Sequence, residues 1–265
     1  MMKILAPFVL LYKYRSMLWQ TTKNDIRSRF AGSVLGMLWL FFYPLLLLGA
    51  YAAVYLFVFK VKFQLFDSNE YVVLIFCGLI PFLGFSEALS LGVGSVVSSA
   101  NLMKNTLFPI ELVPVKAVLA AQCTQVTGLF MLLIVLGILS KWTLWMPFFI
   151  VIWILQILFS SGLIWILSSI NVYARDLQNI VSVLILFLML VSPIAYTEDM
   201  IPPEMRPFLA ANPVYYLIVS YQDVLMLGHF PRGSIFWILL LISFFTFIFG
   251  YWFFMKMKRV FADNV

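Results

Sequence analysis

The sequence predicts an all-α membrane protein with six transmembrane helices and both termini in the cytoplasm. Three observations lead to this fold class: the composition, the apolar runs and the distribution of basic residues. Of the 265 residues, 64% are apolar and 11% are charged. Soluble domains contain about 45–50% apolar and about 25% charged residues, so a water-soluble globule is excluded. Disorder is excluded as well, because it requires low hydrophobicity and high charge.

Six apolar runs are long enough to span a bilayer, which takes about 20 residues of helix. Backbone groups cannot stay unpaired in lipid, so these runs should be helical. Five of the runs contain no Asp, Glu, Lys or Arg, and the second contains only Glu87. Together with their loops the runs form one domain over residues 34–265. The predicted spans are Val34–Phe59, Tyr71–Val96, Ala117–Leu139, Leu144–Ile170, Leu177–Tyr196 and Ser234–Met255.

The basic residues indicate the orientation of the chain. Twelve of the 17 Lys and Arg residues lie in the N-terminal segment, the loops after the second and fourth spans, and the C-terminal tail. Basic loops stay on the cytoplasmic side, so both termini are predicted there. An even number of spans also places both termini on one side. The net charge of +6 is therefore a feature of membrane orientation, and no nucleic-acid partner is expected.

Residues 1–33 form a second predicted unit, a cytoplasmic amphipathic helix at the membrane interface. Apolar and polar side chains alternate over residues 8–30 at a helical period, with Lys13, Lys23 and Arg27 on the polar face. Such a helix lies in the plane of the interface. The pattern fits either a simple membrane anchor or a platform that also contacts a cytoplasmic partner.

Two loops have features of their own. The segment 98–107 predicts a short capped helix that Pro109 ends, and it is either a connecting turn or an element that receives force from a partner. In the loop 197–233, Asn212 and Pro213 predict an N-cap followed by proline at the first helical position. The apolar helix that follows ends before Gly228. It is too short to span, so it is either a re-entrant helix that closes an external mouth or a passive interfacial helix.

No catalytic residue, metal site or cofactor site is expected in this chain. There is no GxxxxGK[ST], HExxH or GxSxG motif, and Cys77 and Cys123 show no metal-ligand spacing. Glu87 is the one acid within a span, and we expect it to form a structural ion pair with Arg29.

Aromatic residues are abundant, with 27 Phe, 12 Tyr and 8 Trp. Their rings can stack on the C–H faces of sugars, or can face lipid and pack as apolar bulk. The conduit candidates crowd the first span: Trp39, Phe42, Tyr43, Tyr51 and Tyr55.

Several segments, in order and spacing, resemble the transmembrane subunits of type-2 ABC exporters of the polysaccharide and polyol-phosphate class, such as O-antigen lipopolysaccharide permeases. The resemblance covers nearly the whole chain. The segments are Asp25–Trp39 with Pro44, Gly78–Phe82 with Glu87, Asn101–Lys104, Phe108–Pro114, Asn171–Leu177, Ser192–Pro193 and Asn212–Pro213.

The resemblance implies a permease in the bacterial inner membrane, which is a transport subunit rather than an enzyme. Two copies would pair with two copies of a separate ATPase subunit that holds ATP and Mg²⁺. The first and fifth spans would wall a conduit at the dimer interface for a lipid-linked polysaccharide. Residues implied in coupling to the ATPase are Lys13, Lys23, Arg27, Asn101, Lys104 and Asn105. Residues implied in the external gate are Pro213, Tyr215, Tyr216 and Tyr221.

Three other functions remain open at this point. Within the family, the cargo could be teichoic acid or a capsular polysaccharide. Outside it, the chain could be a flippase or transferase that works without ATP, or a structural membrane scaffold.

Overall fold

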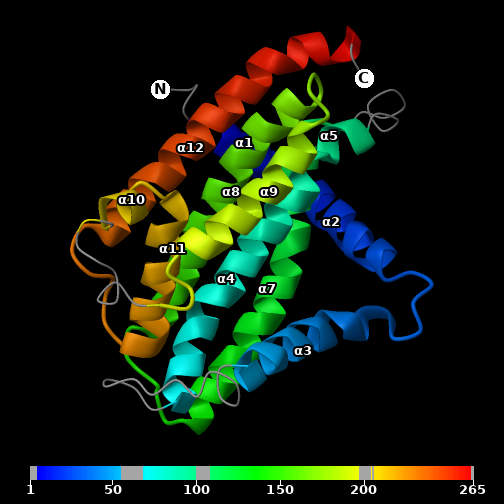
Figure 1. Ribbon diagram of the computed structural model, residues 1–265. Coiled ribbons are helices and arrows are strands. Elements are labelled where there is room, and N and C mark those ends of the chain that lie inside the picture. Colours follow the sequence, from blue (N-terminus) through cyan, green and yellow to red (C-terminus); the bar gives the residue numbers. More distant parts are fainter. Residues whose placement is uncertain (1–4, 55–67, 100–107, 197–203, 205, 264–265) are drawn as a thin grey trace.

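The structure is a computed structural model that describes residues 5–54, 68–99, 108–196, 204 and 206–263. The described residues form helices and no strands. Five helical stretches among them are long and apolar enough to cross a membrane (Figure 1). They are Gly36–Ala53, which ends in α3 (Trp39–Ala53); α4 (Ser68–Val93); α7 (Leu112–Ile138); Met146–Asn171, which ends in α8 (Phe149–Asn171); and α12 (Ile235–Met257).

The fifth predicted span is shorter than the sequence suggests. Its helix, α9 (Leu177–Val191), has 15 residues, which corresponds to a length of about 22 Å. Ser192 is already extended, with φ −80° and ψ 145°. The ring of Pro193 explains this end, because proline disfavours the helical conformation in the residue before it. Five helices, rather than the predicted six, therefore reach spanning length within the described residues.

The predicted N-terminal helix over residues 8–30 is in fact two helices, α1 (Ala6–Lys13) and α2 (Arg15–Arg29). The break falls at Tyr14, whose φ is −104° and ψ is 17°. It lets each helix pack on a different neighbour. The ring of Phe8 lies 4.9 Å from that of Phe247 in α12, whereas α2 packs along α7. One straight helix could not follow both surfaces.

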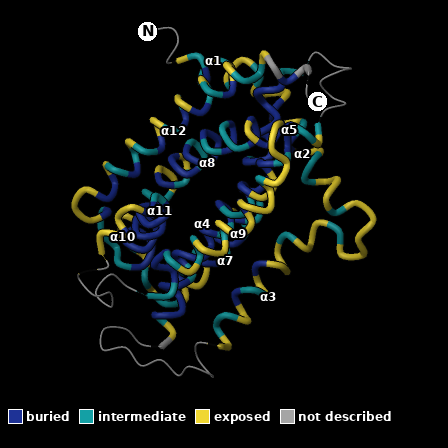
Figure 2. Tube along the Cα trace, turned by 45° about the horizontal axis from the view of Figure 1, so that its top comes forward, coloured by how far each residue is buried: buried dark blue, intermediate teal, exposed yellow. Residues whose placement is uncertain are grey.

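α4 is the central helix of the bundle. Most of its residues are buried, and it packs against α7, α8, α9 and the external helix α11 (Pro213–Gln222) (Figure 2). α7 begins at Leu112, ahead of the predicted start at Ala117, so Lys116 belongs to a helix and not to a loop. The side chain of Lys116 is matched there by Asp25 of α2, at 2.8 Å.

α3 packs on the bundle along one side only, against α7 and α4. Figure 2 shows it exposed along most of its length, and only Pro44 and Leu48 are buried. α9 is similar, since Val181 is its one buried residue. The apolar side chains of these two helices thus face away from the bundle, where a lipid or a second chain must cover them.

Glycines allow α8 and α12 to approach closely. A Cβ atom on Gly162 would lie 2.3 Å from the carbonyl oxygen of Thr246, and one on Gly250 would lie 2.2 Å from that of Gly162. Small residues let helix backbones meet in this way within membranes. Because the atoms in the way are backbone atoms, no side-chain rotation can make room.

The shorter helices lie at two opposite ends of the bundle. α1, α2, the short helix α5 (Ser95–Ser98) and the last turn of α12 lie at one end (Figure 1). A second apolar cluster, which includes Leu18, Leu112, Trp165 and Phe254, joins them. The helices α10 (Arg206–Ala210) and α11 follow α9 toward the opposite end.

Candidate functional site

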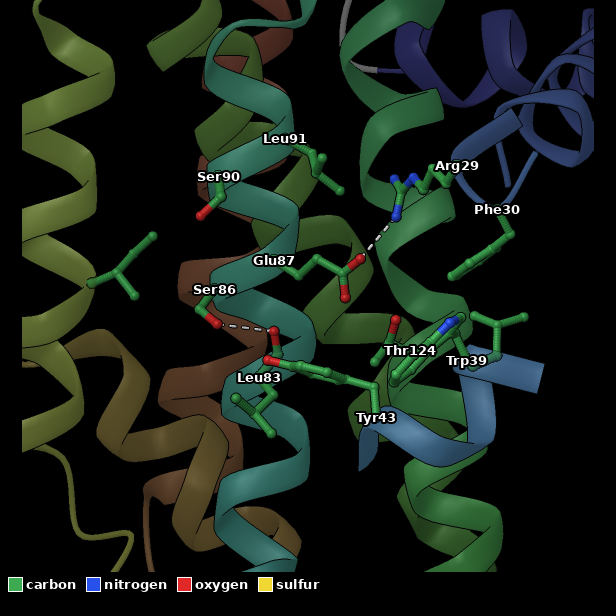
Figure 3. A pocket seen from close by; sticks show the side chains of 12 residues that line it. Arg29, Phe30, Trp39, Tyr43, Leu83, Ser86, Glu87, Ser90, Leu91 and Thr124 are labelled. Carbon is green, nitrogen blue, oxygen red and sulfur yellow. Dashed lines mark hydrogen bonds and ion pairs between the residues drawn. The ribbon is translucent and has the colours of Figure 1, made fainter. Parts of the chain in front are cut away.

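A cleft of about 540 Å³ lies against α4, between α3 and α9. Ligand pockets in proteins typically measure about 300–1,000 Å³. The end of α2 and one side chain of α7 complete its lining, and Figure 3 shows how these side chains are arranged. The lining residues are Arg29, Phe30, Trp39, Leu40, Tyr43, Leu83, Ser86, Glu87, Ser90, Leu91, Thr124 and Ile185.

An ion pair lies in this cleft. The Nη1 atom of Arg29 is 2.8 Å from Oε1 of Glu87, and each side chain is 27% exposed. The hydroxyl of Thr124 lies beside the same carboxylate (Figure 3). Glu87 is six residues, or about 9 Å, from the end of α4. The structure thus brings together the two residues that the sequence pairs, and it explains how a carboxylate is tolerated inside a span.

The five aromatic conduit candidates do not share one environment. Trp39 and Tyr43 line the cleft, and their rings lie on the Glu87 side of α4. Phe42 is exposed on α3 and does not line the cleft. Tyr51 packs against the main apolar core. Tyr55 lies outside the described residues.

The four gate candidates lie on α11. Its start follows the sequence prediction: the Asn212 side chain accepts a hydrogen bond of 2.9 Å from the backbone N–H of Val214, and Pro213 opens the helix. The helix continues as a π-helix (Asp223–Leu227) that ends at Gly228, where φ is +73°. Tyr215, Tyr216 and Tyr221 are buried in the core, and none of them lines the cleft. Their role at a gate stays a prediction.

A buried hydrogen-bond network connects α11 to the centre of the bundle. Tyr221 donates its hydroxyl hydrogen to Oε1 of Gln156 at 2.9 Å. The amide of Gln125 donates to the same oxygen at 2.8 Å, and the amide of Gln156 donates to Oε1 of Gln125 at 2.8 Å and to the carbonyl of Pro81 at 2.9 Å. All three side chains are buried. Sequence reasoning placed Tyr221 among the gate candidates but missed Gln125 and Gln156, although two glutamines inside apolar runs were a signal.

Replacing Gln156 by leucine is expected to lower the free energy of unfolding by about 2–3 kcal/mol. The change removes the donor to Oε1 of Gln125 and the acceptor for the Tyr221 hydroxyl, and it leaves these two side chains the hydrogen bond of 3.2 Å between them. An unsatisfied buried group costs about 1–3 kcal/mol. Thermal unfolding of the purified chain in detergent measures this loss. Ile157→Leu on the next position of α8 is the control, and equal midpoints for the two variants would contradict the role of the network.

A second polar cluster, also missed from sequence, fixes the segment after α11. Asp223 is fully buried, and it accepts hydrogen bonds from the backbone N–H and Nε of Arg232 at 3.0 and 3.1 Å. The Nε2 atom of His229, which the sequence places on a plain surface loop, lies 3.9 Å from Oδ1 of Asp223. Burial raises the pKa of the Asp223 carboxyl, and the contacts with Arg232 and His229 oppose that shift.

The described coupling candidates lie on the N-terminal helices. Lys13, Lys23 and Arg27 are exposed, so a partner could reach them. The remaining three, Asn101, Lys104 and Asn105, lie outside the described residues. At the same end of the bundle, Lys258 forms an ion pair of 2.5 Å with the buried Glu111. Within the described residues, no three His, Cys, Asp or Glu side chains are grouped to hold a metal ion.

The chain is similar to known export permeases. It is 30% identical to the O-antigen export system permease protein RfbA of Myxococcus xanthus over 227 residues, which cover 84% of this chain and 85% of that protein. A permease of the same name from Klebsiella pneumoniae is 31% identical over 78% of this chain and 79% of that protein. The polysialic acid transport protein KpsM of Escherichia coli is 24% identical over 79% of this chain and 81% of that protein.

A family model agrees with these similarities. The model of the ABC-2 type transporter family matches residues 16–226, from α2 to the π-helix that follows α11. Together with the five apolar helices, the relatives identify a multi-pass protein of the bacterial inner membrane. From its sequence match and its helical membrane fold, the chain belongs to the ABC-2 type transporter family.

Proposed function

We propose that this chain is the permease subunit of an ATP-driven exporter that moves lipid-linked O-antigen polysaccharide from the cytoplasmic to the outer leaflet of the inner membrane. The observation that carries the proposal is the similarity to three O-antigen export permeases, at 30–31% identity over 78–91% of the chain. The cleft between α3 and α9 supports it, because it offers aromatic and hydroxyl groups at one face of the bundle.

The working unit is a homodimer that binds two copies of a separate ATPase subunit. The exposed apolar faces of α3 and α9 support this assembly, since a second copy of the chain could cover them. The cleft opens between the same two helices, so a dimer would enclose a path between the subunits. In this arrangement the first and fifth apolar segments form the walls of the conduit, as the family resemblance implies.

The two ends of the bundle have different functions. The end with α1, α2 and α5 faces the cytoplasm, where the basic residues concentrate, and receives the ATPase. α11 lies at the outer end and closes the external mouth. Its anchoring by Tyr221 supports a gate that moves as part of the bundle, because the network ties it to α4, α7 and α8.

Export of a capsular polysaccharide is the second candidate. The similarity to the polysialic acid transport protein KpsM favours it, at 24% identity over 217 residues. The higher identity to the O-antigen permeases places it second.

Reconstitution tests the proposed function. The permease and its ATPase partner are placed in vesicles with lipid-linked O-antigen, and the cargo that reaches the far leaflet is measured by access to an added lectin. We expect translocation only with the ATPase and ATP present. Translocation by the permease alone, or ATP hydrolysis that cargo never stimulates, would reject the proposal.

Reversing the charge of Lys104 is expected to weaken binding of the ATPase subunit. Lys104→Glu places an acid in the loop that is proposed to dock on the ATPase, so we expect co-purification to fall about tenfold, equivalent to about 1.4 kcal/mol. Arg206→Glu, at the exposed start of α10 on the opposite end, is the matched control. Unchanged co-purification of the Lys104 variant would count against this docking site.

A further inference from the structure

We propose that Lys258, at the end of α12, is a positioning residue for coupling to the ATPase. Through Glu111 it sets the position of the start of α7, and thereby of the segment 98–107, which we call the docking segment because it is proposed to meet the ATPase. The inference rests on the proposed function and adds to it the part of the bundle that holds the docking segment in place. Neither Lys258 nor Glu111 belongs to the coupling candidates that the family resemblance implies.

The docking segment begins and ends in the second apolar cluster of the bundle. Val96 of α5 lies just before it and Leu112 of α7 lies shortly after it, and both are fully buried in that cluster. Residues 100–107 lie outside the described part of the chain. The end of α12 contributes to the same cluster and lies beside α5 in both views of the molecule (Figure 1, Figure 2). The position of the docking segment therefore depends on how α5 and α7 sit against the end of α12.

One face of the α12 end is directed toward the start of α7. Phe254, Lys258 and Phe261 are four and three positions apart, so they lie on one face of this helical end. Phe254 and Phe261 are buried, with ring centroids 5.4 Å apart. From the same face, Nζ of Lys258 lies 2.5 Å from Oε1 of Glu111. The end of α12 thus meets α7 through two apolar rings and one charge.

Glu111 is held from two sides. Its backbone carbonyl accepts a hydrogen bond of 2.9 Å from the indole N–H of Trp165, which is fully buried in α8. Its side chain is 5% exposed and pairs with Lys258. The second carboxylate oxygen, Oε2, is buried without a hydrogen-bond partner, so among the described residues Lys258 is the one cation paired with this carboxylate. Helix α8 thus fixes the backbone of the residue that precedes α7, and α12 fixes its side chain.

The ion pair supplies a direction that the apolar cluster lacks. Apolar burial is non-directional, so the cluster alone would let α7 shift along α12. A contact of 2.5 Å between two charged atoms holds at only one relative position of the two helices. Replacing a buried ion pair by neutral side chains of similar volume is often neutral for stability, whereas coupling between distant sites depends on packed elements with defined positions. The pair therefore serves to place the docking segment rather than to keep the chain folded.

The test removes the pair without leaving a buried charge. In the double variant Glu111→Gln and Lys258→Met, both side chains keep their approximate volume. The variant is purified with the ATPase and placed in vesicles with lipid-linked O-antigen. We expect its thermal midpoint and its co-purification with the ATPase to stay close to the wild-type values, because the fold and the docking residues are unchanged. Stimulation of ATP hydrolysis by the cargo should fall about threefold to tenfold, as for residues that carry coupling.

Two single variants identify the cause. Lys258→Arg keeps the cation and should retain most of the stimulation. Lys256→Met removes an exposed cation whose Nζ lies over the ring of Trp252, and it should leave the stimulation unchanged. Wild-type stimulation in the double variant, or an equal loss in Lys256→Met, would overturn the proposal. A loss of stimulation that merely follows a fall in the thermal midpoint would overturn it too, because the pair would then be a purely structural contact.

A distance measurement tests the positioning without any transport. Spin labels at Ser98→Cys and Arg259→Cys, both exposed, report the separation of the docking segment from the end of α12 in a chain whose native cysteines are replaced by alanine. We expect one narrow distance distribution with the ion pair present and a broader one in the double variant. Equal distributions would overturn the proposal.

Failure of this inference is separable from failure of the proposed function. If cargo stimulates hydrolysis equally in the wild type and the double variant, the positioning role is rejected and the exporter role stands. If cargo never stimulates the wild type, the exporter role is rejected, and a broader distance distribution in the double variant would still support the link between Lys258 and the docking segment.

Discussion

Replacing Glu87 by lysine is expected to lower the thermal midpoint of the chain by about 10 °C and to reduce its amount in the membrane. Lysine would place a second cation beside Arg29, where the present separation of the charged atoms is 2.8 Å. Breaking a buried ion pair costs about 3–5 kcal/mol, and partial exposure of this pair places the loss near 3 kcal/mol. A loss of that size shifts the midpoint by about 10 °C in a chain of this length.

The charge swap provides the control for this prediction. Arg29→Glu combined with Glu87→Arg restores opposite charges across the same gap, and it should recover much of the lost stability. The midpoint is measured by fluorescence in detergent, and the amount by quantitative blotting of membranes. A single Glu87 variant as stable as the wild type, or a swap no better than the single change, would show that the pair does not hold α2 to α4.

Replacing Gly162 by alanine is expected to separate α8 from α12 and to cost about 3 kcal/mol or more. The added Cβ would lie 2.3 Å from a backbone oxygen of Thr246, and no side-chain movement can relieve that contact. Overpacking a core usually costs about 1–3 kcal/mol, and backbone against backbone places this case at the upper end. Thermal unfolding in detergent measures the loss.

Gly49→Ala in α3 is the matched substitution. Apart from the neighbouring backbone of α3 itself, no atom of the described residues lies within 4 Å of the added Cβ at that position. Alanine favours a helix by about 0.5–1 kcal/mol over glycine. The Gly49 variant should therefore be as stable as the wild type or slightly more stable. If both variants behave alike, the close approach of α8 and α12 does not limit stability.

Part of the candidate site could be predicted from the sequence because it follows from local chemistry. Glu87 is the one acid within a predicted span, so it required a cation, and Arg29 supplies it. The dipeptide Asn212-Pro213 sets the start of α11 through a cap and a fixed proline φ, and Gly228 sets its end through a positive φ. The cap and the helix end are interactions between neighbours in sequence. The ion pair is predictable because so few charged residues lie within the spans that few pairings are possible.

Other features could not be predicted, because they depend on which helices meet. Gln125 and Gln156 lie 31 positions apart, and only the crossing of α7 and α8 brings their amides within 2.8 Å. The bend at Tyr14 arises because α1 packs on α12 and α2 on α7. In both cases the apolar pattern of the sequence is compatible with several arrangements of the helices, so it does not select the observed one.

The sequence by itself determined that this chain is a helical membrane protein with a charged, amphipathic N-terminus, because hydropathy and charge act on each segment separately. Only the tertiary structure decided that α3 and α9 stand exposed around a cleft while α4 and α11 are buried. All these segments are apolar, and the exposed helices are no less apolar than the buried ones, so hydropathy cannot tell a lipid-facing helix from a buried one. The difference comes from side-chain shape and from a few polar contacts, such as Arg29 with Glu87 and Tyr221 with Gln156, which form only when the helices are assembled.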